Sequence, residues 1–185
     1  MLSSAAKEYL KIYGVLVGKK PLVFTNNDSG YETAIEFKKN GIDPIILDTR
    51  KDPNSEIIQE AKDLNINIKT SYVVVAAKGY KKVNSADIAK LSDDKKNVSN
   101  IENIKCDCIC VSGFWTPTIH LASQSGNKTK FNEEIDAFIP SQSKQKETTL
   151  GAANGVSTLE ETLNSSFKKG SELSKEITNK ENKVS

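Results

Sequence analysis

The stretch that decides the fold runs from Pro21 to Arg50 and reads PLVFTNNDSGYETAIEFKKNGIDPIILDTR. A short apolar run (LVF) leads into a small polar loop (TNNDSG), and the residues after it place apolar side chains at the spacing of one helical face. Asn40 and Gly41 predict the end of that helix, because both tolerate the left-handed backbone of a helix C-terminus. A second apolar run (PIIL) follows. The stretch therefore predicts one β-loop-α-β unit, the first half of a nucleotide-binding fold.

The polar loop of this unit holds the candidate ligand-binding residues Thr25, Asn26, Asn27, Asp28 and Gly30. Such folds usually bind phosphate at the helix N-terminus through a G-x-G-x-x-G loop. On that frame Thr25 and Asn27 take the first two glycine positions, and only Gly30, the glycine that lets helix and strand touch, is kept. The Asn27 side chain fills space that a pyrophosphate needs, and Asp28 adds a negative charge. Two interpretations remain open, an altered nucleotide site and a structural remnant.

Asp48 and Arg50 follow the second apolar run, where this fold places residues that contact the ribose. Asp48 lies about 20 residues after the loop, as a ribose-binding acid does, although a solvated carboxylate at a strand end has the same position. Arg50 is the only arginine of the chain and suits a 2′-phosphate. Asp48 favours NAD, whereas Arg50 favours NADP. Asp48 is nearer the usual position, which favours NAD over NADP.

Composition excludes several classes of function. The net charge is +2 with acids and bases intermixed, so no basic stripe indicates a nucleic-acid partner. No apolar run approaches the roughly 20 residues of a membrane span, and the first residues do not resemble a signal peptide. A length of 185 residues suffices for a domain with a core. We therefore expect a cytoplasmic protein without a membrane or nucleic-acid partner.

Cys106, Cys108 and Cys110 are the three cysteines of the chain. At a spacing of two in a strand they are expected to share one face, which is too constrained for a normal disulfide. The spacing also lacks the turn of a zinc site, which would need His120 or an acid as a further ligand. The pattern favours buried strand thiols, and we expect His120 to be a structural histidine.

The region after the first unit indicates how the sheet continues. A helix is predicted over residues 56–64, capped by Ser55, and antiparallel strands are predicted over 72–77, 81–89 and 98–104. The run CDCICVSG then predicts a return to the parallel sheet. The predicted fold class is α/β, a Rossmann-like parallel sheet with an inserted antiparallel β-meander, as in the NAD(P) domain of flavin-dependent disulfide reductases.

The expected domain organisation has four parts. Residues 1–20 are expected to be a helix and connector from an upstream domain, and residues 21–140 the nucleotide-fold domain. Residues 141–169 form a linker and a Gly-rich segment followed by a helix that Ser157 caps. The polar tail at residues 170–185 is expected to be frayed or disordered.

Several motifs together resemble one family, the alpha subunit of heterotetrameric sarcosine oxidase. The most specific are the loop NNDSGY, which begins at Asn26, and the run WTPTIHL, which begins at Trp115. Further matching segments are YGV from Tyr13, CD from Cys106, VSG from Val111, QSG from Gln124 and GAANG from Gly151. The resemblance covers residues 9 to 156. It implies a part of a complex that oxidises sarcosine to glycine and passes the methyl carbon to tetrahydrofolate, with beta, gamma and delta subunits as partners.

The resemblance also implies where the cofactors of such a complex lie. The flavins are expected on the beta subunit, and NAD on an amino-terminal Gly-rich loop of the alpha subunit that this sequence lacks. The segment from Gly151 to Gly155 resembles the piece that returns to complete that site. The chain departs from the family at Phe114, where a second Gly is usual, and at Ser141, where a Gly is also usual. We therefore expect a middle fragment or truncated subunit that binds NAD weakly by itself.

No catalytic residue is assigned, and two other functions remain open. The first is a degenerate nucleotide fold that serves as a scaffold for partner subunits. The second is part of an NAD(P)H-dependent flavin reductase. The lack of a C-x-x-C or other redox pair in the chain argues against this second function.

Overall fold

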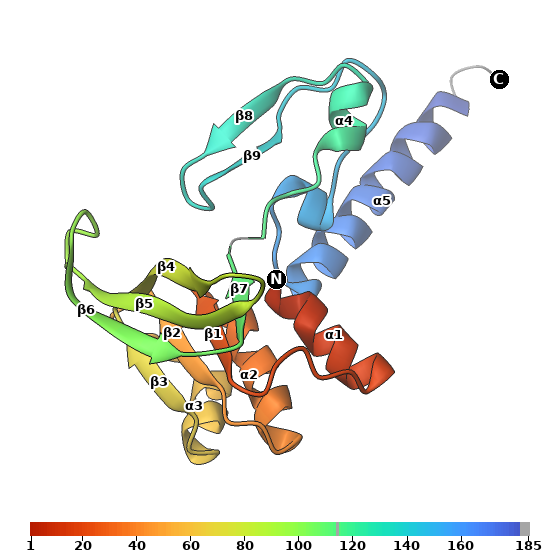
Figure 1. Ribbon diagram of the computed structural model, residues 1–185. Coiled ribbons are helices and arrows are strands. Elements are labelled where there is room, and N and C mark those ends of the chain that lie inside the picture. The colour runs from red at the N-terminus through yellow and green to blue at the C-terminus, as the bar shows by residue number, and fades with distance from the viewer. Residues whose placement is uncertain (114, 182–185) are drawn as a thin grey trace. The chain divides into compact units, whose positions relative to one another are not determined.

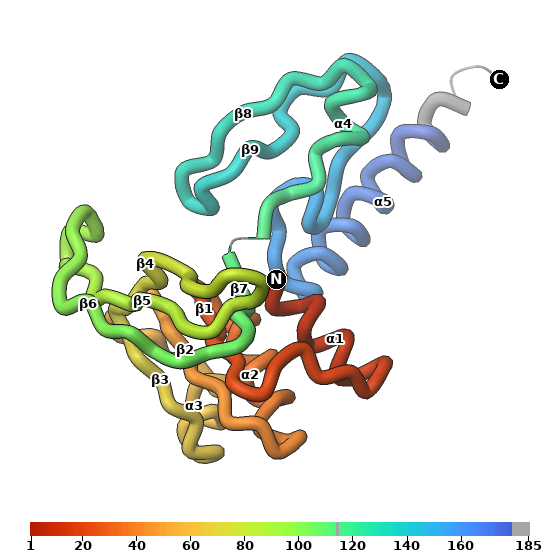
Figure 2. The backbone as a smooth tube through the Cα atoms, in the orientation of Figure 1, coloured from red at the N-terminus to blue at the C-terminus, as the bar shows by residue number. Residues whose placement is uncertain are grey.

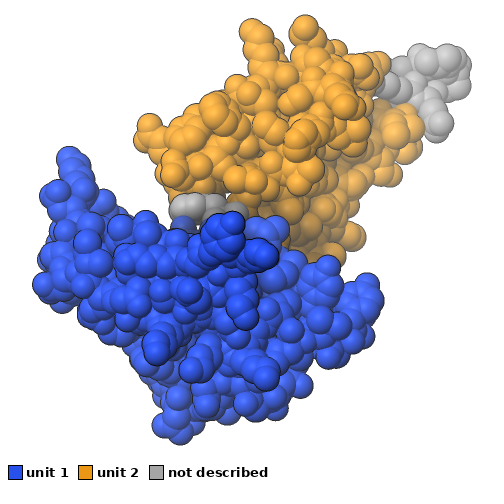
Figure 3. Space-filling view, viewed as in Figure 1, with its two compact units in different colours: residues 1–114 blue, residues 115–185 orange. Residues whose placement is uncertain are grey.

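The computed structural model describes residues 1–113 and 115–181 and divides the chain into two compact units, residues 1–114 and 115–185 (Figure 3). This boundary lies well before residue 140, where the sequence placed the end of the nucleotide-fold domain. It falls instead at the start of the WTPTIHL run. Each unit is described by itself below.

Unit 1 is built on a four-stranded parallel sheet in the order β3-β2-β1-β7. Its strands are β1 (Pro21–Thr25), β2 (Ile45–Asp48), β3 (Asn67–Thr70) and β7 (Cys108–Ser112). The helices are α1 (Ser3–Tyr13), α2 (Ser29–Lys39) and α3 (Glu56–Asp63). A separate three-stranded antiparallel sheet comprises β4 (Tyr72–Gly79), β5 (Val83–Leu91) and β6 (Val98–Lys105). The predicted fold class is confirmed.

The parallel sheet lies between a helical layer and the antiparallel sheet (Figures 1 and 2). On one face Val23 and Ile46 pack against Tyr31 and Phe37 of α2 and against apolar residues of α1 and α3. On the other face Leu22 and the strands beside it pack against the β-meander. Successive residues of β1 therefore serve opposite faces, which explains why its apolar run is continuous.

Two glycines of unit 1 have the roles that the sequence indicated. Helix α2 ends at Lys39, Asn40 caps it, and Gly41 follows with a φ of 77°, in the left-handed region. At Gly30 a Cβ atom would lie 2.5 Å from Cβ and 2.6 Å from Oγ1 of Thr25. That distance is shorter than real contacts allow, so α2 approaches β1 closely only because residue 30 has no side chain.

The amino-terminal helix is part of unit 1. Ala6 of α1 is fully buried in the same core cluster as α2, and Leu2 forms a parallel bridge with Val111 of β7. The expected assignment of residues 1–20 to another domain therefore does not describe their packing. Ser55 begins α3 without the predicted side-chain cap bond.

The three cysteines are free thiols, but they do not share one face. Cys108 and Cys110 face the helical layer, with their sulfur atoms 3.7 Å apart. Cys106 precedes β7 and packs in the opposite cluster, against the β-meander. The expectation of one shared face was wrong because Asp107 interrupts the extended strand. Its carboxylate accepts hydrogen bonds from the backbone N–H groups of Lys19 and Lys20, at 2.8 Å each.

Unit 2 contains a short helix, a hairpin, a 3-10 turn and one long helix (Figure 1). These elements are α4 (His120–Gln124), β8 (Thr129–Asn132), β9 (Ala137–Pro140), η1 (Gly151–Asn154) and α5 (Leu159–Glu181). Helix α5 continues through Gly170 to Glu181, where the sequence predicted a disordered tail; residues 182–185 of that tail lie outside the described residues. Thr158 caps α5, rather than Ser157, and its Oγ1 accepts the N–H of Glu161 at 3.3 Å.

Candidate functional site

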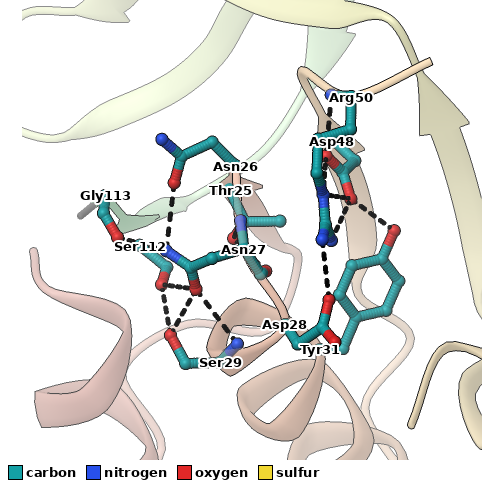
Figure 4. Close-up of polar contacts among 10 residues, drawn as sticks. All are labelled: Thr25, Asn26, Asn27, Asp28, Ser29, Tyr31, Asp48, Arg50, Ser112 and Gly113. Carbon is teal, nitrogen blue, oxygen red and sulfur yellow. Dashed lines mark hydrogen bonds and ion pairs between the residues drawn. The ribbon is translucent and has the colours of Figure 1, made fainter. Parts of the chain in front are cut away.

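The predicted loop residues lie together at the carboxyl edge of the parallel sheet (Figure 4). The loop follows β1, Asp48 ends β2, and Ser112 ends β7. Thr25 is paired in register with Asp48 on one side and with Ser112 on the other. Parallel strands end at the same edge, so the topology brings three separate segments to one place.

The side chain of Asn27 occupies the centre of this edge. Its Oδ1 atom accepts the backbone N–H of Ser29 at 3.0 Å and hydroxyl groups of Ser29 and Ser112 at 2.6 and 3.1 Å. Its Nδ2 atom donates to Oδ1 of Asn26 at 3.0 Å and to the backbone oxygen of Gly113. Figure 4 shows these bonds converging on one amide. Both ends of the Asn27 amide are therefore satisfied within the protein.

The start of α2 is closed by these contacts. Ser29 is the first residue of α2, and its N–H points at the side-chain oxygen Oδ1 of Asn27 rather than at an open space. In a phosphate-binding loop a phosphate oxygen takes that N–H. Thr25 rigidifies the same turn. Its Oγ1 atom donates to the backbone carbonyl of Asn27 at 2.7 Å and accepts the backbone N–H of Asn27 at 3.2 Å. The Asn27 amide stands where the phosphate would bind.

Asp48 and Arg50 also bond within the protein. Asp48 is fully buried. Its Oδ1 accepts the Arg50 backbone N–H at 2.9 Å, and its Oδ2 accepts the Tyr31 hydroxyl and Nη2 of Arg50, each at 2.8 Å. Nη1 of Arg50 forms an ion pair with Oδ1 of Asp28 at 2.8 Å. The only arginine is therefore held between two carboxylates, one from the loop and one from β2.

The electrostatics of this cluster keep its groups in fixed charge states. Burial of the Tyr31 hydroxyl, with its hydrogen bond to Asp48, raises the pKa of Tyr31 above its ordinary value. Burial acts to lower the pKa of Arg50, but hydrogen bonds to Asp48 and Asp28 outweigh it and raise that pKa. Tyr31 is therefore a neutral donor and Arg50 a permanent cation at neutral pH, and neither is poised to exchange protons.

These residues do not fit a dinucleotide. A pyrophosphate needs the α2 N–H that Asn27 occupies, and it would meet the Asp28 carboxylate. Asp48 has no exposed surface for a ribose hydroxyl, and Arg50 is already paired. The predicted dinucleotide-binding role of these residues stays a prediction, and the geometry argues against it.

The remaining predicted residues, Gly151 and Gly155, lie in unit 2 at either end of η1. Their φ angles are 64° and 83°, in the left-handed region. A Cβ at Gly155 would lie 2.7 Å from Cδ1 of Ile135, and one at Gly151 would lie 3.0 Å from Cγ2 of Thr162. Their own unit therefore requires both glycines, whatever else they contact.

Sequence reasoning missed the contributions of Ser29, Ser112 and Gly113 and the hydroxyl of Tyr31. Ser112 ends a strand that neighbours β1, and this position is the signal that could have identified it. His120 is exposed at the start of α4. Among the described residues no cluster of histidine, cysteine and acidic side chains could hold a metal ion.

Comparison with solved structures identifies the fold. The structure resembles thioredoxin reductase from T. acidophilum, with a TM-score of 0.54 and 14% identity over 82% of this chain and 51% of that one. It also resembles the enzyme from Lactococcus lactis, with a TM-score of 0.56 and 19% identity over 75% of this chain and 46% of that one. The chain thus has a Rossmann-like α/β fold similar to that of thioredoxin reductases.

Sequence comparison identifies particular relatives. The sarcosine oxidase alpha subunit of Rhizobium meliloti (strain 1021) is 31% identical over 155 residues, and that of Corynebacterium sp. (strain U-96) is 28% identical over 158 residues. These matches cover 83% and 84% of this chain, but the chain spans only 14% and 16% of the relatives' length. No protein-family model matches. The predicted resemblance to the sarcosine oxidase alpha subunit is confirmed.

Proposed function

We propose that this chain is a non-catalytic nucleotide-fold module of a sarcosine-oxidase-type alpha subunit. The complex it serves would demethylate sarcosine oxidatively to glycine and pass the methyl carbon to tetrahydrofolate. Within that complex the chain would act as a scaffold for the beta, gamma and delta subunits. The similarity to two alpha subunits over more than four-fifths of the chain supports the family assignment.

One observation favours a scaffold over a cofactor site: the Asn27 amide takes the N–H at the start of α2. A phosphate that displaced it would break its bonds to Ser29, Ser112 and Gly113. The Ser29 and Ser112 hydroxyls are half-buried, and each hydrogen bond that they lose costs on the order of 1 kcal/mol. Any NAD of the complex would then be held on another loop, with Gly151 and Gly155 as the residues of this chain expected near it by resemblance.

The absence of an assigned catalytic group has a direct consequence for the isolated chain. The Tyr31 hydroxyl and the Arg50 guanidinium are both hydrogen-bonded to the buried carboxylate of Asp48, and Arg50 is also paired with Asp28. We therefore expect sarcosine oxidation only when the chain is assembled with flavin-bearing subunits.

The test combines assembly and activity. The chain is expressed with an affinity tag, alone and together with sarcosine oxidase beta, gamma and delta subunits, and both preparations are assayed for peroxide release from sarcosine. We expect the tagged chain to retain the other subunits, and only that preparation to release peroxide. Peroxide release by the isolated chain, or failure to retain any of the subunits, would refute the proposed function.

A further inference from the structure

Helix α5 carries an apolar stripe that the described residues of its own unit leave exposed. Among residues 159–178, whose side chains are described, none is buried. Its large apolar side chains have exposed fractions of 74% at Leu159, 60% at Leu163, 80% at Phe167, 41% at Leu173 and 60% at Ile177. The 3-10 turn η1 contacts α5 through Thr162, which flanks one edge of the stripe and leaves its apolar side chains exposed. So much exposed apolar surface on one helix indicates an interaction site.

The stripe has the spacing of a coiled-coil seam. Leu159, Ser166 and Leu173 recur every seven residues, and Leu163, Gly170 and Ile177 form a second such series offset by four. Together the two series correspond to the d and a positions of a heptad repeat. An isolated helix gains only a little stability from each i,i+4 apolar pair. The pattern is typical of a helix that packs along its length against another helix.

The order of residues along the seam is symmetrical about residue 168. If a second α5 runs antiparallel, Leu159 lies opposite Ile177 of the second copy, Leu163 opposite Leu173, and Ser166 opposite Gly170. The small residues meet at the centre and let the backbones approach, while two apolar layers lie on each side. Such a surface is complementary to itself under a two-fold rotation, as an isologous dimer requires.

Phe167 and a neighbouring hollow add a second element of self-complementarity. The hollow measures about 480 Å³ and is lined by Phe167, Gly170, Ser171, Ser174 and Lys175. Gly170 leaves it open, because nothing lies within 4 Å of the Cβ that another residue would have there. In the antiparallel arrangement Phe167 of the second copy reaches the level of residue 169, beside this hollow. In one dimer, the Phe167 side chain of each copy therefore lies beside the hollow of the other copy.

We propose that α5 pairs antiparallel with α5 of a second copy of this chain, so that the protein forms a two-fold dimer. At about 100 Å² for each large apolar side chain, the pair would bury on the order of 1,000 Å², the lower range for a specific interface. The dimer would therefore dissociate at micromolar concentration. This assembly goes beyond the proposed scaffold function and does not depend on it.

The first test measures the mass of the full chain by sedimentation equilibrium from 1 to 200 µM (about the range where such interfaces dissociate). We expect a monomer–dimer equilibrium. Leu163→Gln should weaken it at least tenfold, whereas Lys168→Gln, on the outer face of the same helix, should leave it unchanged. Circular dichroism confirms that both variants are folded. A chain that stays monomeric, or a dimer that Leu163→Gln does not weaken, would overturn the proposal.

The second test checks the orientation of the helices. Ser166→Cys and Gly170→Cys variants are oxidised mildly, separately and as a mixture, and crosslinked peptides are identified by mass spectrometry. The antiparallel pair predicts a disulfide between Cys at 166 of one copy and Cys at 170 of the other, formed only in the mixture. Crosslinks between two copies of the Ser166→Cys variant alone would indicate parallel helices and refute the arrangement.

Discussion

Replacing Gly30 tests whether close packing between α2 and β1 requires a glycine. In an uncrowded helix Gly→Ala would stabilise by up to about 1 kcal/mol. Here the added Cβ would lie 2.5 Å from Cβ of Thr25 and 2.6 Å from its Oγ1. Thr25 cannot easily give way, because its strand pairs on both sides with β2 and β7. Overpacking of this kind costs about 1–3 kcal/mol, which exceeds the propensity gain.

We therefore expect Gly30→Ala to lower the free energy of unfolding by about 1–2 kcal/mol and Gly30→Val by up to about 3 kcal/mol. Urea melts followed by circular dichroism measure both values. Gly113→Ala is the control: apart from its chain neighbours, no described atom lies within 4 Å of the Cβ it would add, and its effect should stay within about 0.5 kcal/mol. A Gly30→Ala variant as stable as the wild type, or more stable, would refute the placement of this loop.

Three further predictions follow from the cluster and the thiols. Asp48→Asn should lower the free energy of unfolding by about 3 kcal/mol, because it leaves a guanidinium without its buried partner. Asp43→Asn is the control: the Asp43 side chain is 85% exposed in its ion pair with Lys38, so this change should affect urea melts little. Since the pKa of Tyr31 is raised on folding, its contribution to stability is fully present below pH ~10 and is lost as the pH rises further, a loss that Tyr31→Phe should abolish in alkaline melts. The hydrogen bond with Cys110 lowers the pKa of Cys108 to about 7, so iodoacetamide should alkylate Cys108 before the other thiols, and Cys110→Ala should move that reaction to higher pH.

Much of the fold could be predicted because its signals are local. The run LVF, the helical spacing after it and the Asn40–Gly41 stop indicated β1 and α2 within one or two residues of their observed ends. The strands of the β-meander were recognisable from β-branched runs and polar turns. The retained Gly30 correctly indicated the close contact between helix and strand.

What the sequence did not reveal depends on distant partners. Ser112, whose hydroxyl bonds to the Asn27 amide, lies 85 residues away in the chain, and no local pattern links the two. From the sequence Arg50 suited a 2′-phosphate, although Asp48 favoured NAD. Its ion pair with Asp28 could not be foreseen, because it requires the loop and the end of β2 to meet. The polar composition from Gly170 onward predicted a frayed or disordered tail. The helix continues there because its neighbours are strong helix formers.

The strands of the hairpin in unit 2 were missed for a different reason. Residues 129–132 and 137–140 are short and mixed in polarity, so their alternation is weak. Their pairing places Phe131 beside Phe138, with ring centroids 5.3 Å apart. Only this cross-strand contact, which appears after folding, distinguishes them from a loop.

The most direct test of the central claim, that Asn27 and Asp28 fill the phosphate position, is a calorimetric titration with NAD. The wild-type chain should bind with a Kd no tighter than about 0.1 mM, equivalent to roughly 5.5 kcal/mol. The double variant Asn27→Gly/Asp28→Ala leaves the Ser29 N–H at the start of α2 without its Asn27 acceptor and removes one of the two carboxylates that pair with Arg50. This variant should bind NAD at least tenfold more tightly than the wild type. Micromolar affinity in the wild type, lost in Asp48→Ala, would contradict the account.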